Sequence, residues 1–320
     1  MSQINAYDIA NQHGDTLSII NFGARLISWH TLVNNESRNI VLAYKSLEDY
    51  LSDPSYLGAI VGPFANRIGG ARCNISGKEI TLTPNEGENQ LHGGDNALAN
   101  QFWLCQHHSA QSLILTCTLK DGFNGYPGDI DVSVKYEITE TSELIISMTV
   151  NTDKVTIAGP TAHPYFNLNS EHGSTKHNLK IYSDHYTPVN NFGIPTGEIT
   201  KVEGTKYDFR IAKPVSCSTN KNPLDHNFLT SLSDTSITHD CRKQATLESE
   251  DKQLALHASS NYPAIQVYTG MHLQTPFTQY QGVCLEPQFC PDSPNQDNFP
   301  FHTTQPGTPL STIIRYSLSK

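Results

Sequence analysis

Apolar residues fall on every second position in several segments of the chain, which is the spacing of half-buried β-strands. The alternation is regular in residues 131–138 (DVSVKYEI), and residues 143–150 (ELIISMTV) follow after the turn-like tetrapeptide TETS. We interpret these two segments as a hairpin. Residues 112–119, 244–249 and 253–258 have the same alternating, β-branched character and predict further antiparallel strands.

Turn-forming pairs such as Asn-Gly, Pro-Gly and Ser-Gly separate the predicted strands, and no long stretch keeps the apolar spacing of a helix. The chain has 320 residues and shows no internal repeat, low-complexity run or linker. We therefore expect an all-β protein with one domain over residues 1–320. Its many strands bury their apolar faces most simply in a large antiparallel β-sandwich or a closed barrel.

The formal net charge of −10 argues against binding to nucleic acid or to an anionic membrane, because either partner would be repelled. No apolar run is long enough to span a bilayer, and the first residues, MSQINAYDIANQHGD, lack the features of a signal peptide. These observations predict a cytoplasmic protein with a small, uncharged or cationic ligand. Monomer and homodimer are both compatible with the sequence.

The seven cysteines form no CxxC pair, so they indicate neither a disulfide framework nor a zinc site. We expect Cys284 and Cys290 to be buried packing residues. The phosphate-binding patterns GxGxxG and GxxxxGK[ST] and the metal motif HExxH are also absent. The sequence therefore predicts no metal and no cofactor, and any chemistry must come from acid and base side chains.

Polar residues interrupt otherwise apolar or turn-rich segments at several places, where burial without a partner would be costly. Each one alone also fits a structural role in a loop, a turn or the core. Together they offer many hydrogen-bonding groups beside aromatic rings, which suits a ligand with many hydroxyl groups, such as a sugar. The candidates are Asn66 and Arg67 in GPFANRIGG, His92 in NQLHGG, His163 in AHPYFNLN, Asp225 in DHNFL, Gln266 and Tyr268 in PAIQVYTG, and Glu286 in GVCLEPQ.

Eight of the motifs occur in the order seen in one known family, and together they cover about residues 17–310: NFGARLISW, GPFANRI, NQLHGG, HPYFNL, IPTGEITKVEGTKYDFR, DHNFL, QVYTG and CLEPQFCPDSPN. The chain thereby resembles the aldose 1-epimerases, or galactose mutarotases. The resemblance implies a single-domain β-sandwich of the galactose mutarotase-like (supersandwich) type. It also implies an isomerase that interconverts the α and β anomers of free aldohexoses, such as galactose and glucose, without a cofactor.

Matched motif by motif, the resemblance implies His163 as general acid and Glu286 as general base. It implies that Arg67 and His92 hold the sugar near its reacting end, with Asn66 beside them. Asp225 and Gln266 match further sugar-binding positions, and Tyr268 shares the face of Gln266. Pro63 occupies a place that often holds arginine in the family, which concerns substrate preference.

Two protonation questions and three alternative functions stay open at this point. We expect a carboxylate with a raised pKa at Glu286 and an imidazolium with a pKa near neutrality at His163, unless Arg67 lies close enough to lower the pKa of Glu286. The alternatives are a hexose-6-phosphate mutarotase, a glycoside hydrolase that uses Asp225 with Glu286, and a sugar sensor without activity.

Overall fold

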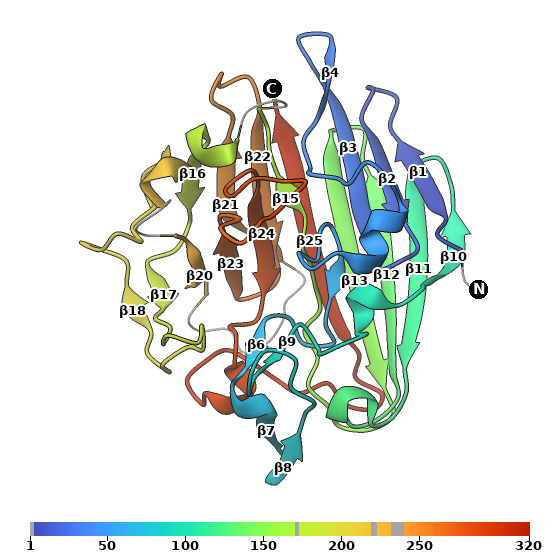
Figure 1. Ribbon diagram of the computed structural model, residues 1–320, viewed down its shortest axis with the longest axis vertical. Coiled ribbons are helices and arrows are strands. Elements are labelled where there is room, and N and C mark those ends of the chain that lie inside the picture. Colours follow the sequence, from blue (N-terminus) through green and yellow to red (C-terminus); the bar gives the residue numbers. More distant parts are fainter. Residues whose placement is uncertain (1–2, 170–172, 219–222, 232–239) are drawn as a thin grey trace.

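The computed structural model describes residues 3–169, 173–218, 223–231 and 240–320, and Figure 1 shows that antiparallel sheets dominate them. The larger sheet has nine strands in the order β10-β11-β12-β13-β25-β22-β21-β16-β19. They are β10 (Leu104–His108), β11 (Ser112–Leu119), β12 (Ile130–Ile138), β13 (Glu143–Thr152), β25 (Leu310–Ser319), β22 (Ala255–Ser260), β21 (Arg242–Glu248), β16 (Asn178–Ile181) and β19 (Lys213–Pro214).

A second sheet has six strands in the order β15-β24-β23-β20-β17-β18. They are β15 (Tyr165–Phe166), β24 (Val283–Gln288), β23 (Ala264–Tyr268), β20 (Asp225–Leu229), β17 (His185–Thr187) and β18 (Thr200–Lys201). A four-stranded sheet joins β1 (Ala6–Ala10), β2 (Thr16–Ile20), β3 (Arg25–Val33) and β4 (Glu36–Asn39).

Three two-stranded ladders complete the described strands: β5 (Ile60–Val61) with β14 (Thr161–Ala162), β6 (Arg67–Ile68) with β9 (Gln90–Leu91), and β7 (Arg72–Ile75) with β8 (Lys78–Thr81). The helices are short 3-10 turns: η1 (Glu48–Ser52), η2 (Gly69–Ala71), η3 (Leu98–Asn100), η4 (Phe123–Gly125), η5 (Ser174–Lys176), η6 (Val215–Ser218) and η7 (Ser293–Asn295). Within the described ranges, no helix has the length and apolar character needed to cross a membrane.

The alternating pattern of the sequence predicts five of the nine strands of the large sheet. Strands β12 and β13 form the expected antiparallel hairpin, and every second residue of β12 is buried. Predicted segments 112–119, 244–249 and 253–258 overlap β11, β21 and β22. The all-β prediction is therefore confirmed, and in β11, β12 and β13 alternate residues are buried, as one face on the core requires.

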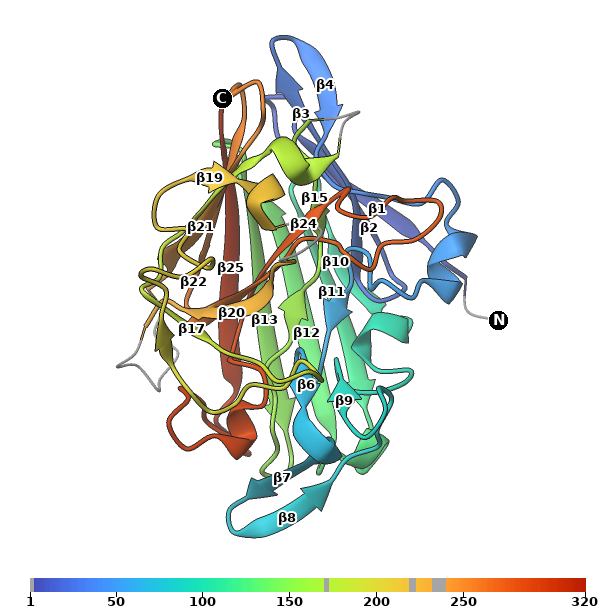
Figure 2. The same ribbon diagram turned by 60° about the vertical axis from the view of Figure 1, so that its left-hand side comes forward.

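The six-stranded sheet lies against the nine-stranded sheet, as Figures 1 and 2 show from two directions. Tyr316 of β25 is buried between them, and its hydroxyl donates a 2.6 Å hydrogen bond to the carbonyl of Leu285 in β24. The Tyr316 ring also lies 5.0 Å from the ring of Phe166 in β15, centroid to centroid. These contacts fix the distance between β24 and the large sheet.

Strand β24 is buried along its whole length although it contains a proline. Strand β15 pairs only with Val283 and Cys284, so Pro287 lies beyond the stretch where a missing backbone N–H would interrupt that ladder. On the other side, β23 pairs with β24 from Cys284 to Gln288. Glu286 is therefore held inside a central strand.

A buried ion pair holds the loop that follows η1 against the core. Arg25 and Asp53 are joined at 2.6 Å, and both side chains are fully buried. The guanidinium of Arg25 also donates to the carbonyls of Leu57 and Ala99, while Asp53 accepts from the backbone N–H groups of Ser55 and Leu57. One pair thereby organises residues 53–57.

We expect Arg25→Met to lower the free energy of unfolding by ~3–5 kcal/mol, because the carboxylate of Asp53 would stay buried without its cation. Urea denaturation followed by circular dichroism measures this loss. The matched control is Arg72→Met, since Arg72 and Glu79 form an exposed pair at 3.8 Å, for which we expect a change of at most ~1 kcal/mol. Equal losses in both variants would contradict the role given to Arg25.

Candidate active site

Strands β15, β24, β23 and β20 bring polar side chains to one face of the six-stranded sheet. Gln266 is paired with Glu286, and Tyr268 is paired with Cys284. Asp225 is in turn the cross-strand partner of Tyr268. Paired residues and every second residue along a strand share one face, so the register alone gathers these groups.

Asn66, Arg67 and His92 come from the β6–β9 ladder and the turn after it. The backbone N–H of His92 donates to the carbonyl of Asn66, and the N–H of Asn66 donates to Nδ1 of His92 at 3.1 Å. Gly93 follows with φ +87°, and a Cβ there would lie 2.3 Å from the carbonyl oxygen of Gly62. Only glycine fits this approach, as the motif NQLHGG suggests.

The two groups of residues face a common cavity of about 300 Å³. Seven of the eight predicted site residues line it: Asn66, Arg67, His92, His163, Asp225, Tyr268 and Glu286. Gln266 lies on the same sheet face, paired with Glu286, and its Nε2 donates a 2.7 Å hydrogen bond to Oδ1 of Asp225. Gln266 therefore orients a lining carboxylate.

His163 and Glu286 meet at the buried part of the cavity. Nε2 of His163 lies 3.6 Å from Oε2 of Glu286, and the two residues are only 5% and 2% exposed. The backbone of His163 is fixed on both sides, because its N–H donates to Ala59 and its carbonyl accepts from Gly58. An imidazole and a carboxyl group therefore line the cavity side by side.

Burial controls the protonation of this pair. It raises the pKa of Glu286 well above its usual range, and the nearby charge of Asp225 adds to the effect. It lowers the pKa of His163 to about 4. The prediction of a near-neutral pKa for His163 is therefore wrong, because its burial outweighs the carboxylates around it. Burial therefore favours a pair that shares one proton over two separate charges.

Cys284 packs as predicted among buried aromatic residues, and Cys290 is also buried. In addition, the Sγ atom of Cys284 lies 3.7 Å from Nδ1 of His163. Among the described residues, His163, Cys284 and Glu286 are the one group with metal-ligand spacing, with ligand atoms within 4.8 Å of one another. Burial raises the pKa of the Cys284 thiol, which disfavours the thiolate that a metal requires.

His92 is a neutral donor toward the cavity. Its Nδ1 accepts from the backbone of Asn66, which leaves the proton on Nε2. Burial lowers the pKa of His92 well below its ordinary value, and the positive charge of Arg67 acts in the same direction. The rings of Tyr56 and His163 lie 4.7 and 5.5 Å from the His92 ring.

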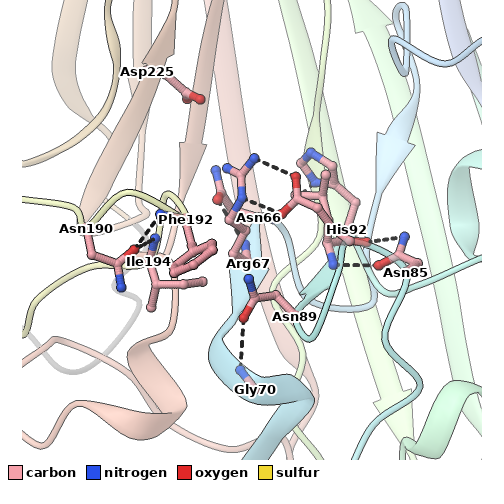
Figure 3. Close-up of polar contacts among 12 residues, drawn as sticks. Asn66, Arg67, Gly70, Asn85, Asn89, His92, Asn190, Phe192, Ile194 and Asp225 are labelled. Atoms are coloured by element: carbon pink, nitrogen blue, oxygen red, sulfur yellow. Dashed lines mark hydrogen bonds and ion pairs between the residues drawn. The ribbon is translucent and has the colours of Figure 1, made fainter.

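Arg67 is held by a carboxylate that the sequence analysis does not single out. Its Nε and Nη2 donate to the two carboxylate oxygens of Glu86 at 2.6 and 2.7 Å, as the dashed lines at Arg67 in Figure 3 show. Burial opposes the charge on Arg67, but the bonds to Glu86 and the charge of Asp225 keep its pKa raised.

Other lining residues are also absent from the sequence prediction: Pro54, Ser55, Tyr56, Leu91, Tyr165, His272 and Gln274. Tyr165 belongs to the motif AHPYFNLN, so its position beside His163 was available as a signal. Tyr56 has a positive φ of 55°. It lines the cavity because Asp53 holds the loop of residues 53–57 beside it. No pattern around Tyr56 in the sequence indicates this.

Comparisons with known proteins agree with this geometry. The family model described as aldose 1-epimerase matches residues 5–317. The aldose 1-epimerase of Escherichia coli K12 is 31% identical and aligns with 96% of this chain and 93% of its own length. The galactose mutarotase of Mus musculus is 33% identical, with 88% of this chain and 86% of its own length aligned.

Solved structures show the same fold. A GalM/aldose epimerase homologue from C. elegans superposes with a TM-score of 0.92 at 28% identity and covers 99% of both chains. A galactose 1-epimerase from Lactobacillus acidophilus gives 0.85 at 25% identity, with 99% of this chain and 98% of that chain covered.

The buried neutral histidines predict that acid destabilises the fold. The folded-state pKa of His163 is about 4, below the ordinary value, so the unfolded chain binds more protons between about pH 6.5 and pH 4. Stability must therefore fall as the pH falls through this window. Urea titrations at several pH values should show a slope that His163→Asn reduces by up to ~1.4 kcal/mol per pH unit. The exposed control His13→Asn should keep the full slope, and an unchanged slope in His163→Asn would refute the shift.

Proposed function

The chain belongs to the aldose 1-epimerase family and is an isomerase that interconverts the anomers of aldoses, and we propose that His163 and Glu286 carry out the proton transfers. The observation that carries this proposal is the buried contact of the two groups at 3.6 Å beside the cavity. Free aldohexoses such as galactose and glucose are the proposed substrates.

Anomer exchange moves protons and breaks one ring bond. Glu286, as carboxylate, takes the proton of the C1 hydroxyl while the imidazolium of His163 gives its Nε2 proton to the ring oxygen. The bond between C1 and the ring oxygen breaks, and C1 becomes an aldehyde. After rotation about the bond from C1 to C2, both proton transfers run backwards and close the ring as the other anomer. Protons and electrons balance without a cofactor.

The shared proton supplies the starting state. Its movement from Glu286 to His163 produces the carboxylate and the imidazolium together, and hydrogen bonds from the sugar hydroxyls stabilise the new carboxylate. Both groups are returned to their original state at the end of each turnover. The pair can therefore work in either direction, as an enzyme that equilibrates two anomers must.

The other lining residues supply sugar-binding groups in this proposal. Nε2 of His92, the guanidinium of Arg67 and the amide of Asn66 act as donors, while Asp225 accepts from hydroxyl groups. Tyr268 offers both a ring face and a hydroxyl. Gln266 acts through its hydrogen bond to Asp225.

Two of the three alternatives lose support at this site. Arg67 is the one Arg or Lys among the described lining residues, and its pairing with Glu86 leaves little for a sugar phosphate. The intact histidine and glutamate argue against a sensor without activity. A single domain over residues 1–320, a cytoplasmic location and a monomeric or dimeric state stay predictions.

We expect Glu286→Gln and His163→Asn each to lower the turnover number by ~100-fold or more, because each removes one proton-transfer group. Polarimetry of freshly dissolved α-D-galactose and α-D-glucose measures the rate above the spontaneous background. The exposed control Glu36→Gln should keep the wild-type rate. Near wild-type turnover in either active-site variant would overturn the assignment.

The shared proton also predicts the pH dependence of kcat/KM. Below about pH 4 a second proton occupies the pair and removes the base, so the rate must fall on the acid side. At high pH the remaining proton leaves and removes the acid. The acid-side rise of kcat/KM is therefore expected near pH 4, and a steep rise centred near pH 6.5 would show that His163 titrates there.

A further inference from the structure

The carboxylate of Glu86 binds the guanidinium of Arg67, yet the proposed reaction does not use it. Glu86 lines the cavity together with Arg67. Both of its oxygens accept from the guanidinium, which is the bidentate geometry that most strongly fixes an arginine. The side chain of Glu86 is 36% exposed and that of Arg67 is 19% exposed, so solvent screens the pair only in part.

The turn that carries Glu86 is itself firmly held. The side-chain amide of Asn85 accepts from the N–H of Leu91 and donates to its carbonyl. Oδ1 of Asn89 accepts from the N–H of Gly70, and the backbones of Glu86 and Asn89 bond to each other. Figure 3 shows Asn85 and Asn89 on the two sides of this turn. The carboxylate therefore has a fixed position.

The opposite side of the guanidinium is closed by a second turn. A Cβ on Gly193 would lie 3.1 Å from both Cζ and Nε of Arg67, so the backbone of Gly193 packs directly on the guanidinium. The side chain of Asn190 accepts from the N–H groups of Phe192 and Ile194 and ties this turn together (Figure 3). Arg67 is enclosed between a carboxylate and a backbone surface.

This arrangement decides the charge that a ligand meets. Glu86 balances the charge of Arg67, and burial disfavours an imidazolium at His163. The carboxylate of Asp225 also lines the cavity and accepts a hydrogen bond from the side-chain amide of Gln266. An anionic group on a sugar would therefore meet two carboxylates and an arginine that is already paired.

We propose that Glu86 is a specificity-determining residue, which orients Arg67 for binding hydroxyl groups and excludes aldoses that carry an anionic group, such as uronic acids and sugar phosphates. Selection works here by repulsion of the wrong ligand as well as by attraction of the right one. The inference rests on the proposed function of the cavity, and it names the substrate class as neutral aldoses.

The test compares D-galactose with D-galacturonate, which differ by a carboxylate in place of the C6 alcohol, and adds D-glucose 6-phosphate. Anomer exchange is followed by NMR in the wild type, Glu86→Gln and Glu88→Gln. Glu88 is exposed on the same turn, so this control makes the same charge change outside the cavity.

For the wild type we expect kcat/KM on galacturonate to be at least ~100-fold below that on galactose. Glu86→Gln should raise kcat/KM on the anionic substrates by ~10-fold and lower kcat/KM on galactose by ~5-fold. Both changes should come chiefly from KM, because Arg67 loses its fixed partner. Glu88→Gln should leave both values within twofold. Comparable use of galactose and galacturonate by the wild type, or equal effects of the two variants, would overturn the proposal.

A second measurement needs no variant. Added salt should relieve the exclusion of galacturonate in the wild type while galactose turnover stays constant, because only the anion is repelled by charge. A galacturonate rate that does not respond to salt would contradict the proposal even if Glu86→Gln failed to fold. A wild type inactive on every sugar, galactose included, would instead refute the proposed function.

Discussion

The site depends on the pairing of β23 with β24, which sets Gln266 opposite Glu286 and Tyr268 opposite Cys284. A shift of one residue in this register would turn Glu286 toward the apolar core and Leu285 toward the cavity. The contact of Tyr316 with the carbonyl of Leu285 holds the strand at its height over the large sheet. Backbone pairing and core packing thus determine where the carboxyl group lies before any ligand is present.

Burial in that position has a chemical result. A carboxyl group and an imidazole that are both removed from water cannot easily be charged alone, so they hold one proton between them. The same burial that would be costly for two separate ions is tolerable for a neutral pair. Proton exchange between the two groups then needs no supply of protons from solvent during the reaction.

The sequence predicts several strands and the presence of His163 and Glu286 at the cavity, because alternation of apolar residues and the motifs around these two residues are local signals. Glu86 is missed because its role depends on the pairing of Arg67 with Leu91, which brings the turn of residues 85–89 beside Arg67. The low pKa of His163 depends on its depth below the surface. Depth results from packing of the two sheets, and a local pattern does not contain it.

The buried pair of Arg25 and Asp53 has a consequence for the timing of substrate exchange. It ties residues 53–57, and with them one wall of the cavity, to the same core that holds the sheets together. Opening this wall would disturb that core. We therefore expect sugar entry and anomer release to proceed without a gating movement of residues 53–57.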